Sequence, residues 1–109
     1  MIYRVFHHQP GTLGFMFPGQ LQFPEDYDQV ADVEGDDLDQ VYRLTQNLDG
    51  EDWTSGPRVS NVQITEARSS SVGDMFVDED GRLWQVDFIG WKGMGSVLVP
   101  ASIVPEKST

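Results

Sequence analysis

The sequence has no cysteine, only two histidines and only seven basic residues among its 109 positions. Without cysteine, disulfides, thiolate zinc sites and cysteine nucleophiles are excluded. The apolar runs are short, whereas a membrane-spanning helix needs roughly 20 apolar residues. The N-terminus also lacks the apolar stretch and the small-residue cleavage site of a secretory signal. We therefore expect a cytoplasmic protein that does not associate with membranes.

The apolar residues that are present suffice for one folded domain. They make up 39% of the chain and include six Phe, three Tyr and three Trp. A chain of 109 residues can bury one compact core but is too short for two ordinary domains. We predict a single domain over residues 1–109.

Acidic residues outnumber basic ones by 18 to 7, and the excess is confined to about a quarter of the chain. The segment Glu25–Asp52 holds eleven carboxylates and one base, Arg43, which gives a net charge of −10 out of the total of −11. Nucleic-acid phosphates are bound by clustered Lys and Arg, so direct nucleic-acid binding is disfavoured. A basic protein surface is the favoured partner.

Two explanations of this acidic segment stay open. Exposed carboxylates keep a small domain soluble, and those at a helix start interact favourably with the helix dipole. Alternatively, the carboxylates imitate a nucleic-acid backbone and occupy the phosphate-binding groove of another protein. One base among eleven acids favours imitation, because ordinary solvated surfaces mix charges. The candidate contact residues are Asp26, Asp28, Asp32, Glu34, Asp36, Asp37 and Asp39.

Alternation, turn residues and one helical stripe predict an α+β fold, with a mainly antiparallel sheet of about five strands and one helix packed on it. The strand from 27 to 34 is expected to turn its even-numbered residues, which are mostly acidic, toward solvent. A helix is expected to begin after Asp37 as N-cap, with Gln40 in a capping-box position, and to end at Gly50. The expected strands are 2–7, 27–34, 75–77, 82–89 and 96–100, with a further candidate at 59–65.

Two apolar segments are candidates for partner contact or core packing. The connection at 9–24 carries Phe15 and Phe17, which we expect to fill the core. The glycine-rich stretch from 90 to 95 is expected to form a bend that exposes Trp91 and Met94. We add these two residues to the candidate contact surface, because aromatic residues and Met are favoured anchors at interfaces.

No catalytic, metal-binding or cofactor-binding motif stands out. His7 and His8 are neighbours on a predicted strand, so they should point to opposite faces and not share a metal or a proton. The sequence Asp78–Gly81 lacks the spacing and closing Glu of a calcium loop and is predicted to be a hairpin turn. Ser69–Ser71 lacks the flanking glycines of a nucleophile elbow. We expect no cofactor and no enzymatic activity.

One part of the chain resembles a known family. The run Arg68–Val77, followed by Asp80-Gly81, Trp84–Asp87 and Gly90-Trp91, is similar to the core motif of the YodL-like domain family. That family is of uncharacterised function and frequent in phages, plasmids and other bacterial mobile elements, and the resemblance implies no catalytic residues.

The most specific part of the resemblance is Ser-Val-Gly-Asp at 71–74. We expect Ser71 and Asp74 to be structural. Asp74 should accept hydrogen bonds from backbone N–H groups at the entry to a strand, and Gly73 should allow a tight bend before it.

These observations favour a non-catalytic binding protein of a phage or other mobile element. Its acidic face would occupy the nucleic-acid-binding surface of a basic host protein, as an anti-defence inhibitor does. One alternative is a small ligand-binding domain or enzyme with a site under the Phe15 loop. Another is a structural or virion component.

Overall fold

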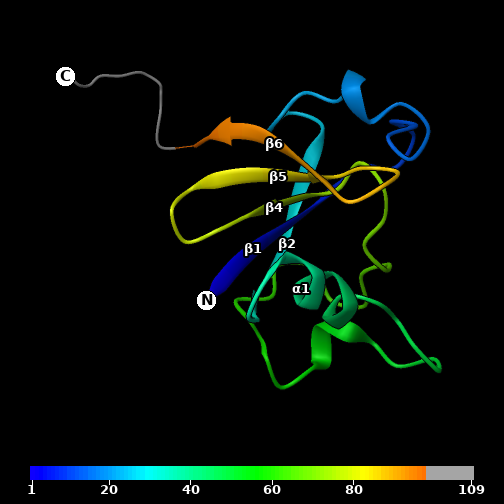
Figure 1. Ribbon diagram of the computed structural model, residues 1–109. Helices are drawn as coiled ribbons and strands as arrows, with labels where there is room; N and C mark the ends of the chain where they lie inside the picture. Colours follow the sequence, from blue (N-terminus) through cyan, green and yellow to red (C-terminus); the bar gives the residue numbers. More distant parts are fainter. Residues whose placement is uncertain (98–109) are drawn as a thin grey trace.

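The computed structural model describes residues 1–97, which form a six-stranded antiparallel sheet with one α-helix against it (Figure 1). The α+β class is as expected, with six strands in place of about five. The strand order is β3-β2-β1-β4-β5-β6. The strands are β1 (Ile2–His8), β2 (Tyr27–Glu34), β3 (Val59–Ser60), β4 (Met75–Val77), β5 (Arg82–Val86) and β6 (Trp91–Ser96).

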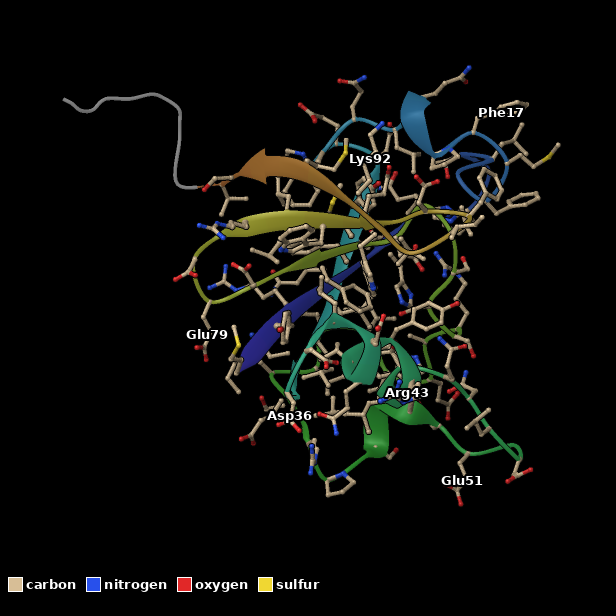
Figure 2. All side chains as sticks on the ribbon, viewed as in Figure 1. Phe17, Asp36, Arg43, Glu51, Glu79 and Lys92 are labelled. Carbon is tan, nitrogen blue, oxygen red and sulfur yellow. The ribbon has the colours of Figure 1, made fainter. Side chains whose placement is uncertain are left out.

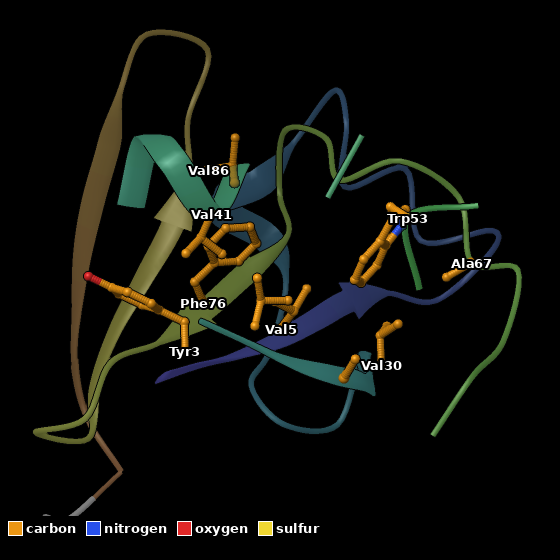
Figure 3. Packing of buried hydrophobic residues seen from close by; sticks show 10 residues of the cluster. Tyr3, Val5, Val30, Val41, Trp53, Ala67, Phe76 and Val86 are labelled. Carbon is orange, nitrogen blue, oxygen red and sulfur yellow. The ribbon is translucent and has the colours of Figure 1, made fainter. Parts of the chain in front are cut away.

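The main core lies between the sheet and the helix α1 (Leu38–Leu44). Val41 from α1 and Trp53 from the following segment pack against buried side chains of the central strands (Figure 3). Val5 and Phe76 are fully buried there, on the neighbouring strands β1 and β4. Burial of apolar surface is the main stabilising term in a domain of this size.

The connection 9–26, which includes a 3-10 turn at Pro18–Gln20, covers a second, smaller cluster. Tyr27, Met75 and Leu83 are buried in this cluster, and Phe23 from the connection packs against them. Figure 1 shows the connection at the opposite end of the molecule from the segment that follows α1. No helix within residues 1–97 is long and apolar enough to cross a membrane.

The helix begins where the sequence predicts. The Asp37 carboxylate accepts a hydrogen bond from the backbone N–H of Gln40 at 2.8 Å, and the Gln40 side chain accepts one from the N–H of Asp36 at 2.6 Å. These bonds satisfy donors that have no partner within the helix.

We expect Asp37→Ala to lower the free energy of unfolding by about 1 kcal/mol, because the cap is lost. Asp37→Asn is the matched control and should leave the stability almost unchanged, since Asn caps as well as Asp. Urea unfolding followed by tryptophan fluorescence measures both. Equal destabilisation by the two variants would contradict a capping role.

The helix ends earlier than predicted, at Leu44 instead of near Gly50. Asn47 bonds to the segment that follows: its amide donates to the Ala67 carbonyl and its backbone N–H donates to Ser69 Oγ. These local and long-range bonds replace the helical ones. Leu48, which lies inside the predicted helix but beyond its observed end, is 65% exposed.

The predicted strand at 59–65 is reduced to Val59–Ser60. Asn61 has a positive φ of 49°, a conformation that ends the extended run and that Asn tolerates better than most residues. The backbone N–H groups of Gln63 and Ile64 then both point to the Val30 carbonyl.

The prediction of the C-terminal hairpin is correct in the position of the hairpin but wrong in the length of its second strand. β4 and the turn at Asp78–Gly81 are as predicted, and β5 ends at Val86 instead of Ile89. The bend expected from 90 to 95 is wrong, because this stretch forms most of β6 and a turn closed by the N–H of Asp87 and the carbonyl of Gly90 precedes it. The strand expected at 96–100 and the frayed tail at 106–109 fall mostly or wholly outside the described residues.

Candidate partner-binding surface

The seven candidate carboxylates do not share one face of β2, because the strand contains a bulge. The register passes from Val5 opposite Ala31 to Phe6 opposite Gln29, so Val30 is an extra residue. A one-residue insertion in a strand turns every side chain beyond it to the opposite face of the sheet. The predicted clean alternation is therefore wrong, since Asp28 faces the other side from the acids that follow the bulge.

The bulge divides the acids into two groups. Asp26 and Asp28 lie at the end of β2 near the connection 9–26, where Asp26 accepts from the backbone of Gln22 and Asp28 from the side chain of Gln9. The second group lies near the chain start, because Glu34 pairs with Ile2. This group consists of Asp32, Glu34, Asp36, Asp37 and Asp39.

These carboxylates lack basic partners in the part of the chain that the structure describes. Within residues 1–97 the ion pair with a basic side chain is that of Arg68 with Asp74, and the two histidines approach the same carboxylate. Arg43, the base inside the acidic segment, and Arg58, which donates to Gln40 at 3.5 Å, form no ion pair there. None of these carboxylates therefore forms an ion pair within residues 1–97, although Arg4 lies opposite Asp32 in the strand register.

Among the seven candidate carboxylates, Asp32 is the least available for contact with a partner. One of its oxygens accepts from Asn61 at 3.3 Å, and the other is buried with no hydrogen-bond partner. It lines a hollow of about 320 Å³ together with Arg4 and Glu79. The exposed members, above all those from Glu34 to Asp39, are better placed for contact.

The structure brings together two candidate residues that are 52 positions apart. The Trp91 indole N–H donates to the Asp39 carboxylate at 2.9 Å. The Trp91 ring is half-buried and packs at 5.0 Å on Phe76 and edge-on at 6.2 Å on Tyr42. The expectation that Trp91 is exposed is therefore only partly met, because one side of its ring belongs to the core.

A hollow of about 270 Å³ opens beside this pair. It lies between α1 and the turn that joins β5 to β6, with carboxylates and aromatic rings both in its wall. The lining residues are Asp39, Tyr42, Val86, Asp87, Phe88 and Trp91, with Val72 and Gly90.

Exposed apolar side chains gather elsewhere too. Phe15 and Phe17 are 52% and 46% exposed, which corrects the expectation that they fill the core. Figure 2 shows Phe17 at the periphery of the molecule. The residues of the connection that pack on the smaller cluster are Leu21 and Phe23 instead. Met94 is 37% exposed, near the expected state.

A buried network around Asp74 holds the end of β1. Asp74 is fully buried and accepts hydrogen bonds from the backbone N–H groups of His8 at 2.9 Å and Ser71 at 2.7 Å. Arg68 donates to both carboxylate oxygens, at 2.7 and 2.8 Å. The predicted structural role of Asp74 is confirmed, as is the tight bend at Gly73, where φ is +94°.

The two histidines meet at this carboxylate, which sequence reasoning missed. His7 lies against Trp53 on the helix side of the sheet, whereas His8 lies against Gly14 on the other side. The Nε2 atom of each is 3.7 Å from a different oxygen of Asp74. They do point to opposite faces, but Asp74 lies between them just before β4, and so they share one acid.

This arrangement does not present a nucleophile to solvent. His7 Nε2 and Ser70 Oγ are 2.9 Å apart, but His7 is 5% and Ser70 2% exposed. Asp74 approaches the same His7 nitrogen as Ser70 does, whereas a catalytic triad places the acid on the other nitrogen. Burial lowers the pKa of His7 to about 4, against the opposing effect of Asp74 and with a further lowering by Arg68.

Tyr27 anchors the opposite side of the same bend. Its hydroxyl donates to the Gly73 carbonyl at 2.6 Å and accepts from the Gln85 side chain at 3.1 Å. Burial raises the pKa of Tyr27 to about 12, so the phenol stays a donor. No group of three or more metal-ligating side chains is found in residues 1–97.

Comparisons with protein-family models, with curated proteins and with solved structures find no match to this chain.

Proposed function

We propose that the chain is a non-catalytic binding protein that docks on a basic surface of a host protein through its acidic face. The basic surface is one that otherwise binds nucleic acid, so the bound protein acts as an inhibitor. The observation that carries the proposal is the set of exposed carboxylates from Asp28 to Asp39 that find no basic partner within residues 1–97. Unpaired surface charge of one sign attracts a partner of the other sign.

The length of the acidic region also suits this purpose. Asp28 and Glu34 lie opposite His7 and Ile2, which are five positions apart on β1, and at about 3.3 Å per residue this is roughly 17 Å. A duplex advances about 3.4 Å per base pair, so the carboxylates span roughly five base pairs. Their division between two faces favours a partner that contacts both faces of the sheet at β2, which β3 flanks at Asp32 and Val33.

The biological setting follows from the YodL-like resemblance. Proteins of that kind are frequent in mobile elements, where blocking a defence complex in the cytoplasm of the host is useful. A restriction or CRISPR complex has the basic groove that this surface would enter.

The test compares two variants of equal charge. One converts Asp28, Glu34, Asp36 and Asp37 to their amides, which preserves the helix cap. The control converts four exposed acids outside the candidate surface: Asp49, Glu51, Glu66 and Asp80. Immobilised protein is exposed to nuclease-treated bacterial lysate, and captured proteins are eluted with duplex DNA.

We expect the unaltered protein and the control to capture a protein that duplex DNA elutes, and the first variant to capture at least tenfold less. Capture should also weaken steeply as NaCl rises from about 50 to 200 mM, as it does for phosphate contacts. Equal losses in both variants would show that net charge matters and position does not. Capture that duplex DNA does not reverse would contradict the proposal.

The alternatives remain distinguishable by other means. A ligand-binding domain or enzyme with a site under the Phe15 loop would show a rise in melting temperature with its small ligand. A structural or virion component would form large homo-oligomers on sizing.

A further inference from the structure

We propose that the hollow beside Trp91 binds the guanidinium group of an arginine side chain. The inference rests on the proposed function, because it names the chemical group by which the basic partner is recognised. It assigns a role to a place where residues from α1, β5 and β6 converge, and it is independent of how the other carboxylates act.

The shape of the hollow suits one flat cation on an apolar stem. Its volume is about 270 Å³, enough for one side chain. Trp91 and Tyr42 both line it, with their rings nearly perpendicular at 86°. Because Trp91 also packs on Phe76 at 5.0 Å, its ring is held in place before any ligand arrives. A fixed aromatic ring binds cations at a lower entropic cost than a mobile one.

Two carboxylates give the hollow its charge. Asp39 uses one oxygen to accept from the Trp91 indole, and within residues 1–97 its other oxygen has no hydrogen-bond partner. Asp87 accepts only from the backbone N–H of its neighbour Phe88. Neither acid has an ion-pair partner in the part of the chain that the structure describes.

The nearest base in sequence does not fill the hollow. Lys92 pairs with Gln85 across β5 and β6, and the Gln85 side chain bonds to Tyr27 on the opposite face of the sheet. Trp91 and Lys92 are consecutive in a strand, so they face opposite sides. No base within residues 1–97 lines the hollow, and we therefore place the cation on another molecule.

Guanidinium fits this wall better than ammonium does. It is planar and weakly hydrated, it stacks on aromatic rings, and it can donate to two acceptors at once. Asp39 and Asp87 supply acceptors, and Trp91 supplies a ring. The apolar side chains of Val72 and Val86 in the same wall suit the alkyl stem of arginine.

Trp91 also provides the readout. The three indole N–H groups have different acceptors: the Arg68 carbonyl for Trp53, Asp78 for Trp84 and Asp39 for Trp91. They should therefore give three separate signals in a ¹⁵N–¹H spectrum. The probe is N-acetyl-arginine-methylamide, and the matched control compound is N-acetyl-citrulline-methylamide, which has the same shape without the charge.

We expect the arginine compound to shift the Trp91 signal saturably, in the millimolar range, while the other two indole signals stay in place. The double variant Asp39→Asn/Asp87→Asn should bind at least fivefold more weakly, since the amides keep the local hydrogen bonds and remove the charge. Asp49→Asn/Asp80→Asn removes two charges outside the hollow, so it is the matched control and should bind as the unaltered protein does.

Several outcomes overturn the inference. These are no shift of the Trp91 signal, an equal shift with the citrulline compound, or unchanged binding in the double variant. If the arginine compound does not bind but duplex DNA still elutes a captured protein, arginine binding in the hollow is ruled out and the proposed function stands. If the arginine compound binds but no partner is captured, arginine binding in the hollow is supported and the proposed function is wrong.

Discussion

Replacing Asp74 by alanine is expected to lower the free energy of unfolding by about 3 kcal/mol, near the lower end of the range for a broken buried ion pair. Asp74 is fully buried and is the acceptor for two backbone N–H groups and for the Arg68 guanidinium. Its loss leaves these donors without their partner, although Arg68, with 42% of its side chain exposed, can be rehydrated. Urea unfolding measures the change.

The variant Asp74→Asn keeps the shape and removes the charge, so we expect about half of that loss. Arg68→Ala and the double variant complete a cycle that isolates the pair. The two single effects should not add, because both remove the same contact. A loss below about 1 kcal/mol for Asp74→Ala would show that this network does not hold the end of β1.

Lowering the pH from 7 to 4.5 is expected to destabilise the fold through His7 by about 2–3 kcal/mol. The pKa of His7 is about 4 in the folded protein and 6.5 for a solvated histidine in an unfolded chain, because burial disfavours the charged ring. Between these values the unfolded chain binds a proton that the folded chain does not. The contribution of His7 to the free energy of unfolding is therefore fully present above pH 6.5 and is lost as the pH falls toward 4.

Carboxylates also titrate in this range, so the effect of His7 must be separated from theirs. The variant His7→Gln has no proton to bind and can still bond to Ser70. The difference in unfolding free energy between the two proteins should shift by about 2–3 kcal/mol between pH 7 and 4.5. Parallel pH profiles for the two proteins would contradict the buried, neutral state of His7.

Features set by neighbouring residues could be predicted from the sequence. The start of α1 follows from Asp37 and Gln40, which are three positions apart and bond to each other. The turn before β5 follows from its Asp-Gly pair, since Gly81 adopts a positive φ of 81°. The role of Asp74 follows in part, because Ser71 lies three residues before it and donates to it.

Features that depend on distant residues could not be predicted. The bulge at Val30 arises from the pairing of β2 with β1, and no residue inside β2 signals it. It is the reason why Asp28 and Asp32 face opposite sides. The end of α1 depends on bonds from Asn47 to residues 67 and 69, which lie far along the chain.

The candidate site illustrates the same limit. Charge predicts Asp39 as a contact residue, and aromatic character predicts Trp91. Their hydrogen bond could not be foreseen, because it requires β6 to lie beside β5 and α1 to cover that part of the sheet. The glycines around Trp91 predict a bend, whereas pairing with β5 holds the stretch extended.

The Phe15 loop lies outside the core, although its composition predicts burial. Phe15 and Phe17 are apolar, yet they stay about half exposed, and Leu21 and Phe23 are the residues of the connection that pack on the smaller cluster. Figure 2 shows Phe17 and Asp36 at opposite ends of the molecule. The apolar loop is therefore a surface separate from the acids that follow β2.

The central claim is that the acidic face and nucleic acid compete for one surface of the partner. The most direct test mixes the purified partner with this protein and a fluorescent DNA duplex, and separates the complexes by size. We predict two binary complexes and no ternary one, with the duplex released in proportion to the protein added. A stable complex containing the partner, the duplex and this protein together would contradict the claim.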